Sequence, residues 1–326
     1  MKRVCTLSFL VCAFSALIWG QQKMRIATYN VENLFDLQHD SLHEDWAFVE
    51  GGEYHWTKNR YWRKLDQIGR VVMAMGEGDT PPAIVGLCEV ENDTVMRDLT
   101  RRSLLRGAGY EYVMTNCRDR RGIDVALMYQ PGLFRLLDYE SLRIPSERIG
   151  MAPTRDLLHA WGLTRTGDTL HIIECHLPSQ TGGMAKAGKH RLLAARTLAH
   201  VCDSVLAQGK GRRLVVMGDF NTGPRDRIFK RYLYPLLHTL MPTSSKALRQ
   251  PHGTYRFQGR WSYLDHILVS KNVDFSDEKG QIGDFPWLLE PDSHGGFHPH
   301  RTFGGTSYKG GTSDHLPVYF DLLLPR

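Results

Sequence analysis

The side chains best suited to catalysis in this sequence are acids, amides and imidazoles at the ends of apolar segments. They are Asn30 and Glu32 in TYNVEN, Glu89 in GLCEVEN, His176 in ECHLPS, Asp219 and Asn221 in VVMGDFN, Asp265 in YLDHILVS, and Asp314 and His315 in TSDHLPVY. A carboxylate at the edge of an apolar strand needs a cation, a hydrogen-bond donor or a proton, because burying it unpaired is costly. Acids that converge on one face also repel each other. The pattern therefore favours a divalent cation such as Mg²⁺, which prefers oxygen ligands and leaves positions open for a substrate phosphate.

The segments that must position these residues alternate between strands and a few helices. Apolar residues three or four apart predict helices over 58–75 and 187–206, and a shorter helix is expected over 94–106. Short apolar runs predict strands over 24–31, 83–90, 110–114, 125–130, 170–177, 213–220, 263–269 and 316–324.

The composition indicates a folded globular protein, and the pattern of its segments indicates sheets covered by helices. The chain has 326 residues, of which 42% are hydrophobic and 23% charged, and this excludes disordered and fibrous classes. Several strands, such as LVVMGDF, are apolar on nearly every residue, which predicts burial on both faces. An arrangement with the sheets inside and the helices outside buries both faces of such strands. Because no linker, charge block or short repeat interrupts the chain, we expect a single domain over 21–326.

The first twenty residues have the pattern of a signal peptide. Lys2 and Arg3 precede an apolar run over 4–19, which ends before Gly20. The run is shorter than the ~20 residues that span a bilayer as a helix, although a retained membrane anchor is the alternative. We expect an exported protein, periplasmic or extracellular. Removing Lys2 and Arg3 leaves 39 basic and 35 acidic residues, and this net charge of +4 is compatible with nucleic acid or phospholipid headgroups.

Seven motifs together resemble those of the endonuclease/exonuclease/phosphatase superfamily, which is deoxyribonuclease-I-like. They are TYNVEN, CEVEN, RGIDVALMY, CHLPS, GDFNT, YLDHI and SDHLPV, in the order found in the family, and the resemblance runs from residue 24 to 320. Each motif is weak alone, and the ordered set is strong. The resemblance implies a four-layer α/β/β/α sandwich, in which two mainly antiparallel or mixed sheets pack together with helices on both outer faces.

The resemblance also implies a metal site for Mg²⁺ or Mn²⁺. By this comparison Glu89 is the main metal ligand, and Asn30, Glu32 and Asp314 assist it.

The remaining site residues are similar to the family's catalytic groups. By this resemblance Asp219 orients or deprotonates the attacking water, and Asn221 donates hydrogen bonds to the phosphoryl group. His315, held by Asp265, and His176 flank the phosphate. The resemblance implies in-line attack without a covalent intermediate, and whether Asp219 or an imidazole is the base stays open.

Two residues of RGIDVAL are weaker candidates for substrate binding. Arg121 reaches the substrate phosphate or is simply solvated, with the second favoured, and Asp124 pairs with His176 or is a surface carboxylate. Other polar or reactive residues have structural interpretations. We expect His266 to be packed in a strand, His294, His298 and His300 to be loop residues, and Cys88 and Cys175 to be buried thiols.

Two surface features leave the substrate open. The segment 285–303 is rich in aromatics, Gly and Pro, so it is a long loop or hairpin that packs back on the domain, stacks on bases or dips into a membrane interface. Arg97, Arg101, Arg102 and Arg106 contact phosphates or form a solvated helix face.

We therefore expect an exported, metal-dependent phosphoesterase, foremost a phosphodiesterase or nuclease. The alternatives are a sphingomyelinase-like lipid phosphodiesterase or a phosphomonoesterase such as an inositol-phosphate phosphatase. A non-catalytic binding protein is the remote alternative, because an inactive relative usually lacks one of the acids or histidines and here all are present. We expect neither an organic cofactor nor an obligate protein partner.

Overall fold

The computed structural model describes residues 22–179, 184–209, 211–241, 253–276 and 280–325. The expected signal peptide over 1–20 lies outside these residues. Within them, no helix is long and apolar enough to cross a membrane.

The first of two large sheets contains the N-terminal and C-terminal strands side by side. Its order is β13-β18-β1-β2-β4-β3. The strands are β1 (Lys23–Leu34), β2 (Ile84–Val90), β3 (Glu111–Met114), β4 (Asp124–Tyr129), β13 (Gln281–Ile282) and β18 (Val318–Leu323). Only β1 and β2 run parallel to each other among these neighbours; the other pairs are antiparallel.

The second large sheet has the order β5-β6-β7-β8-β12-β9 and again one parallel pair, β7 with β8. Its strands are β5 (Phe134–Leu142), β6 (Leu157–Thr164), β7 (Thr169–His176), β8 (Arg213–Asp219), β9 (Leu237–Leu240) and β12 (Asp265–Ser270). Three of them, β5, β6 and β9, were not predicted. The edge strand β5 exposes Leu137 and Tyr139 and carries charged residues, so its apolar pattern is weak.

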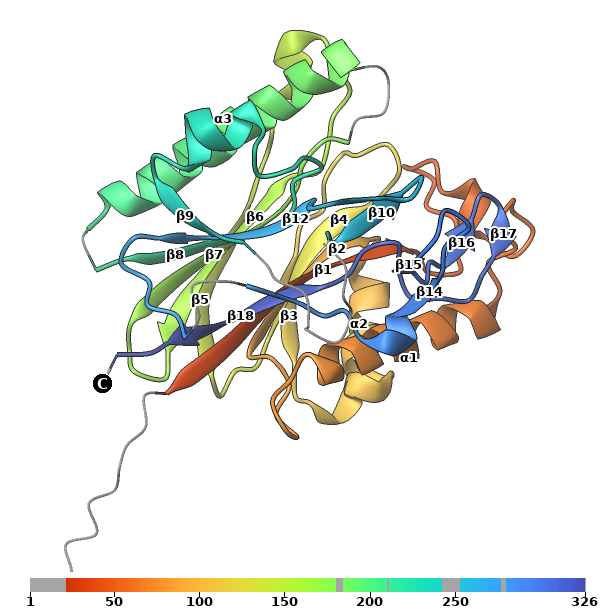
Figure 1. Cartoon of the computed structure of the whole chain (residues 1–326), viewed down its shortest axis with the longest axis horizontal. Coiled ribbons are helices and arrows are strands. Elements are labelled where there is room, and N and C mark those ends of the chain that lie inside the picture. The colour runs from red at the N-terminus through yellow and green to blue at the C-terminus, as the bar shows by residue number, and fades with distance from the viewer. Residues whose placement is uncertain (1–21, 180–183, 210, 242–252, 277–279, 326) are drawn as a thin grey trace, which may run out of the picture.

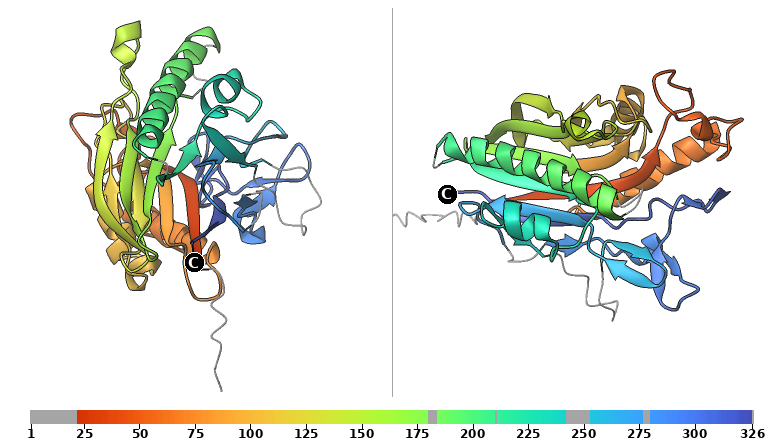
Figure 2. Two further views of the ribbon diagram at one scale, coloured as in Figure 1. Left: turned by 90° about the vertical axis from the view of Figure 1, so that its left-hand side faces the viewer. Right: turned by 90° about the horizontal axis from the view of Figure 1, so that it is seen from above.

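Alternate residues of the strands enter different cores, which explains the nearly continuous apolar runs. In β1, Ile26 packs between the two sheets, whereas Ala27 packs toward α1 (Lys58–Ala74) and α2 (Asp93–Arg101). In β8, Val215 lies between the sheets and Val216 packs toward α3 (Met184–Ala207). Figures 1 and 2 show the helices on the two outer faces of the paired sheets. The predicted four-layer α/β/β/α sandwich is confirmed.

Capping residues set the helix boundaries. The Thr57 side chain accepts a hydrogen bond from the Arg60 amide at the start of α1, and Asn92 accepts one from Val95 at the start of α2. The predicted helix over 94–106 ends early as an α-helix, at Arg101, and continues after a break as the 3-10 turn η2 (Leu104–Gly107).

Short elements complete the fold and include three two-stranded hairpins. The hairpins are β10 (Tyr255–Phe257) with β11 (Arg260–Ser262), β14 (Leu289–Pro291) with β15 (Phe297–Pro299), and β16 (Phe303–Gly304) with β17 (Ser307–Tyr308). The other short helices are the 3-10 turns η1 (Trp46–Phe48), η3 (Ser146–Ile149) and η5 (Pro286–Leu288), and the π-helical turn η4 (Phe229–Leu233).

The aromatic segment over 285–303 packs back on the domain. Leu288 is buried, and the Arg70 guanidinium lies 4.1 Å from the centre of the Trp287 ring. Of packing on the domain, stacking on bases and insertion into a membrane interface, packing is therefore what Trp287 and Leu288 do.

The other structural expectations concern buried histidine and cysteine. His266 is buried, and its Nε2 atom lies 2.9 Å from the Thr222 carbonyl. Cys88, Cys117, Cys175 and Cys202 are buried free thiols. His294, His298 and His300 lie in or beside the β14–β15 hairpin.

Candidate active site

The ends of five central strands meet at one edge of the sandwich. In the second sheet, Asp219 on β8 stands opposite His176 on β7 and opposite Asp265 on β12, so strand register alone brings these three together. Asn30 on β1 stands beside Cys88 on β2. A cleft of ≈ 660 Å³ opens here, and its lining includes the predicted residues Glu32, Glu89, Arg121, His176, Asp219, Asn221, Asp314 and His315.

Unusual backbone conformations aim several of these side chains. Glu32 (φ 52°), Glu89 (φ 66°) and Asn221 (φ 52°) all adopt the left-handed region, which non-glycine residues seldom enter. The strand register shifts at both acids, between Asn30 and Leu34 in β1 and between Cys88 and Val90 in β2. A bulge of this kind redirects a side chain from the sheet face. Such strain persists where the surrounding structure enforces it, and it is concentrated here at the cleft.

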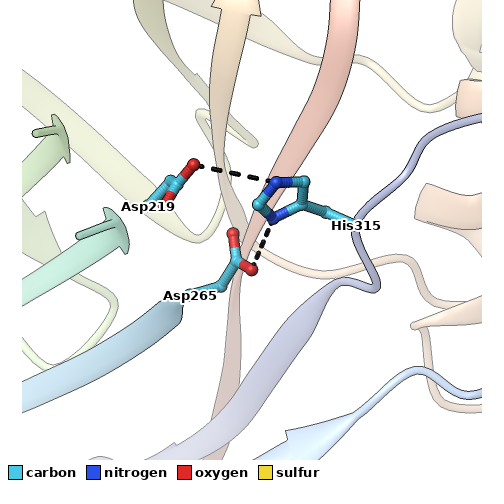
Figure 3. A group of neighbouring side chains, drawn as sticks. All are labelled: Asp219, Asp265 and His315. Atoms are coloured by element: carbon cyan, nitrogen blue, oxygen red, sulfur yellow. Dashed lines mark hydrogen bonds and ion pairs between the residues drawn. The ribbon is translucent and has the colours of Figure 1, made fainter. Parts of the chain in front are cut away.

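His315 lies between two carboxylates (Figure 3). Its Nδ1 atom is 2.7 Å from Asp265 Oδ2, and its Nε2 atom is 3.8 Å from Asp219 Oδ2. Burial alone would lower the pKa of His315, but the Asp265 and Asp219 carboxylates outweigh it and raise this pKa well above its usual value. His315 is therefore a buried imidazolium whose orientation Asp265 fixes.

Asp219 is the centre of the hydrogen-bond network. It accepts bonds from Asn30 Nδ2 at 3.0 Å and from the Asn221 amide at 2.8 Å. Asn221 Nδ2 also donates to the Leu177 carbonyl at 2.9 Å. Burial raises the pKa of Asp219 to about 7, although the neighbouring His315 opposes this shift. A carboxylate so buried and so bonded has a fixed orientation at the floor of the cleft.

Glu89 and His176 face each other across the cleft. The distance from His176 Nε2 is 3.9 Å to Glu89 Oε1 and 3.6 Å to Asp219 Oδ2. Burial and the Arg155 guanidinium keep the pKa of His176 well below its usual value, so this ring is neutral. Burial disfavours the Glu89 anion, but the Arg121 guanidinium, the two neighbouring histidines and the Asn33 amide together outweigh it and lower the pKa of Glu89 to about 2. Arg121 Nη2, 3.4 Å from Glu89 Oε2, lies at the cleft and not only in solvent.

Glu32 and Asp314 also line the cleft. Glu32 accepts hydrogen bonds from the Thr302 amide at 2.6 Å and the Phe303 amide at 3.2 Å. The buried Lys64 donates to the Glu32 carbonyl and, at 2.6 Å, to Thr302 Oγ1. Burial, and after it the Asp314 charge, raises the pKa of Glu32 to about 7. The Glu32 carboxylate thus anchors the 302–303 backbone as well as lining the cleft.

The donor set fits a hard divalent cation. Glu89, Glu32 and Asp314 supply carboxylate oxygens to one cleft, and burial together with the Glu89 charge raises the pKa of Asp314. Glu32 and Asp314, whose pKa values are raised partly by neighbouring acids, are relieved by a cation that prefers oxygen. Asp219, Asp265 and His315 are also close enough to hold an ion. The ligand atoms of this second group all lie within 4.8 Å of one another.

The structure places Asp124 away from the cleft. Asp124 is buried, and its carboxylate accepts bonds from the Thr115 hydroxyl and, at 3.0 Å, from the Cys117 amide. It therefore neither pairs with His176 nor lies on the surface, because these donors at the start of β4 satisfy it.

Sequence reasoning missed the wall formed by the β10–β11 hairpin. Tyr255 and Phe257 line the cleft, and the Tyr255 ring centre lies 4.9 Å from that of His315. The Phe257 side chain is exposed, at 58%. The signal was the TYRF stretch ten residues before the LDH motif. Asn33, within TYNVEN, also lines the cleft and donates its amide to Glu89 Oε2 at 2.9 Å.

Comparison with known proteins identifies relatives of this arrangement. A sequence model described as the Endonuclease/Exonuclease/phosphatase family matches residues 25–323. No curated protein sequence matches the chain.

Solved structures share the fold. An endonuclease/exonuclease/phosphatase family protein from Bacteroides thetaiotaomicron is 15% identical, covering 94% of this chain and 100% of its own, with a TM-score of 0.60. A mannosyl-6-phosphatase of Bacteroides thetaiotaomicron is 19% identical, covering 92% and 100%, with a TM-score of 0.60. The catalytic domain of human Nocturnin, with a bound sulfate anion, is 17% identical, covering 92% and 94%, with a TM-score of 0.56.

Proposed function

Because the chain belongs to the Endonuclease/Exonuclease/phosphatase family and is a phosphoesterase of it, we propose that it is a divalent-metal-dependent phosphodiesterase acting on nucleic acid. The observation that carries the proposal is the convergence of Glu89, His176, Asp219 and His315 on one cleft, from segments far apart in the sequence.

The residues divide between holding a cation and handling the phosphate. Glu89, with Glu32, Asp314 and Asn30, would hold Mg²⁺ or Mn²⁺, which supplies charge neutralisation at the phosphoryl oxygens when bound. Asp219 Oδ2, which is fixed by Asn30 and close to both histidines, would orient the attacking water and accept its proton. The His315 imidazolium and the Arg121 guanidinium would stabilise negative charge that builds on the phosphate. These positively charged groups are preorganised, because Asp265 fixes His315 and Glu89 contacts Arg121.

Export is a separate part of the proposal. It rests on the charged, then apolar pattern of residues 1–20, which the structure does not describe. Expression of the full chain in a bacterial host, with and without residues 1–20, tests it. We expect the full chain in the periplasm or medium, shortened by about twenty residues by mass spectrometry, and the truncated chain in the cytoplasm.

The catalytic proposal is tested by substrate and by substitution. Purified protein is assayed with Mg²⁺ on bis(p-nitrophenyl) phosphate, single-stranded DNA, RNA, sphingomyelin and inositol phosphates. We expect cleavage of the diester and of nucleic acid, and a rate about 10²- to 10⁴-fold lower for Asp219→Asn. Asp138→Asn, the same change at an exposed position of β5, is the control.

Other results would redirect the assignment. Turnover of sphingomyelin alone would indicate a lipid phosphodiesterase, and turnover of inositol phosphates alone a phosphomonoesterase. Full activity of the Asp219→Asn variant would reject the role of Asp219. Absence of hydrolysis on every substrate would favour a binding protein.

A further inference from the structure

A second hollow, outside the cleft, lies between α3 and the turn η3. Its volume is ≈ 900 Å³, and Arg143, Arg148, Arg196, His200 and Glu147 are the charged or titratable residues of its lining. Ser146 Oγ and His190 Nε2, 2.7 Å apart, join the turn to α3 at this point. We refer to this hollow as the basic groove; Figure 1 shows η3 beside the N-terminal half of α3.

The basic groove has unneutralised positive charge. Three guanidinium groups face one carboxylate, which leaves a charge of +2 with His200 neutral, and Glu147 is already bonded to Arg143. Among the described residues, neither Arg148 nor Arg196 has an ion-pair partner, and both are exposed. The arginines in and directly after α2 differ, because Arg97, Arg101 and Arg102 each pair with an acid within 3.6 Å. The paired arginines near α2 therefore form a solvated helix face. The basic groove differs in presenting arginines that have no acidic partner among the described residues.

The basic groove lies at the same edge of the second sheet as the catalytic residues. Leu158, near the start of β6, pairs with Glu174, two residues before His176, and the connection 143–156 therefore leaves the sheet at the cleft end. Arg155 in this connection donates to the carbonyl of Leu177, the residue that follows His176, at 2.9 Å.

Further arginines connect the two sites. Arg118 is close enough to Glu147 and Asp156 to interact with both electrostatically, and it shares a loop with Arg121, which lines the cleft. Positive side chains thus extend from the cleft to the groove along one edge of the molecule. A small phosphate ester would contact only the cleft, whereas a chain of phosphates would reach both.

We propose that the basic groove binds the phosphate backbone of a nucleic-acid strand at nucleotides beyond the scissile bond. This inference rests on the proposed action on nucleic acid and adds a second contact region to it. Arg148 and Arg196 supply the contacts, since their guanidinium groups pair with no acid in the described part of the chain. Each phosphate neutralised releases condensed counterions, so these contacts must appear in the salt dependence of binding.

The test measures binding of a fluorescein-labelled single-stranded oligonucleotide by anisotropy over a series of KCl concentrations. An Asp219→Asn background with Mg²⁺ keeps the strand intact. We expect Arg148→Gln with Arg196→Gln to raise Kd several-fold and to reduce the slope of log Kd against log salt by about 1.4, at about 0.7 per phosphate contact. The matched control is Arg106→Gln with Arg135→Gln, which removes two exposed arginines elsewhere.

A second measurement separates this inference from the proposed function. In the active background, the groove variant should hydrolyse bis(p-nitrophenyl) phosphate as the parent does. If the parent does not hydrolyse bis(p-nitrophenyl) phosphate, the catalytic proposal is rejected. The oligonucleotide Kd and its salt dependence then still decide whether the basic groove binds a strand. Unchanged Kd and slope in the groove variant would overturn the inference, as would a parent that binds phosphatidylglycerol vesicles but no oligonucleotide at low salt.

Discussion

At the scale of single residues, the central feature is a histidine held charged inside the protein. His315 is nearly inaccessible, yet Asp265 at 2.7 Å and Asp219 at 3.8 Å make its protonated form the stable one. The Asp265 carboxylate has two effects, because it fixes the ring through Nδ1 and balances its charge. It is a positioning residue, since it acts on the phosphate only through His315.

Replacing Asp265 by Asn should therefore impair turnover more than substrate binding. The amide keeps the size of the side chain but removes the charge that stabilises the imidazolium. We expect kcat on a phosphodiester to fall by about 10²-fold or more, with KM changed little. Steady-state kinetics of Asp265→Asn beside Asp138→Asn measures this. Equal losses in both variants, or a rise in KM alone, would contradict the role given to His315.

Metal binding at Glu89 should be visible in thermal stability without any assay of activity. A cation that binds only the folded chain raises the melting temperature by mass action, and chelation reverses the effect. We expect Mg²⁺ to raise Tm of the parent by a few degrees and to leave Glu89→Gln unchanged. Glu111→Gln, the same change at a glutamate that pairs with Arg101 outside the cleft, is the control. An equal Mg²⁺ response in Glu89→Gln would place the cation elsewhere.

Much of the site was predictable from residue type because acids and histidines at the ends of apolar strands have few structural uses. What the sequence did not reveal was conformation. The left-handed backbone of Glu32 and Glu89 has no local signal, because glutamate seldom adopts it, whereas asparagine, as at Asn221, enters this region more often. For Asp124, the residue type was misleading. A carboxylate at the start of a strand can belong to a site or can be satisfied locally, and here Thr115 and Cys117 donate the hydrogen bonds that satisfy it.

At the scale of elements, the two sheets are linked by a buried acid beneath the cleft. Glu174 on β7 accepts hydrogen bonds from Thr28 Oγ1 on β1 at 2.8 Å and from Cys88 Sγ on β2 at 3.3 Å. Burial raises the pKa of Glu174 to about 8, so the neutral acid predominates near neutral pH. Gly86 leaves it room, because a Cβ there would lie 1.8 Å from Glu174 Oε2.

This contact predicts a non-additive pair of substitutions. Gly86→Ala should destabilise by about 1–3 kcal/mol or more through overpacking, and Glu174→Ala by a similar amount through the cavity and the unpaired Thr28 hydroxyl. Together they should cost at least about 1 kcal/mol less than the sum, since the methyl group added at position 86 then occupies space left by the carboxyl. Urea unfolding of the four proteins measures the coupling, and Glu174→Gln should stay close to the parent. Strict additivity would show that the two side chains do not share this space.

The composition of β5 and β6 shows why these two strands were not predicted. Residues 134–142 form an edge strand in which Phe134 is the one buried side chain, so neither alternation nor a continuous apolar run marks them. Residues 157–164 contain His159, Trp161 and Gly162 on a largely buried strand. Their partners across the sheet, and not their own composition, hold them extended.

At the scale of the whole molecule, stability should depend on pH through a chain of imidazoles on the α3 side of the second sheet. Arg212 Nη1 donates to His171 Nε2 at 2.8 Å, which leaves the Nδ1 proton of His171 to donate to His159 Nε2 at 3.0 Å. His159 Nδ1 in turn donates to Glu140 at 2.8 Å. Each ring is neutral in this order, and a second proton on His171 would have to face the Arg212 guanidinium.

The sign of the pH effect follows from the two states of His171. Burial, together with His159 and Arg212, lowers the pKa of His171 to about 4 in the folded protein. The pKa of a histidine in the unfolded chain is about 6.5. Between these values the unfolded chain binds a proton that the folded chain excludes, so stability is full above about pH 7 and declines as the pH falls toward 4. We expect His171→Gln to remove about 1 kcal/mol of the loss in unfolding free energy between pH 7 and pH 5, after allowance for solvent screening. Urea titrations at both pH values measure it, with His238→Gln, exposed on β9, as the control. A parent whose stability rises on acidification through this window, or an identical pH dependence in His171→Gln, would show that the imidazole chain does not set it.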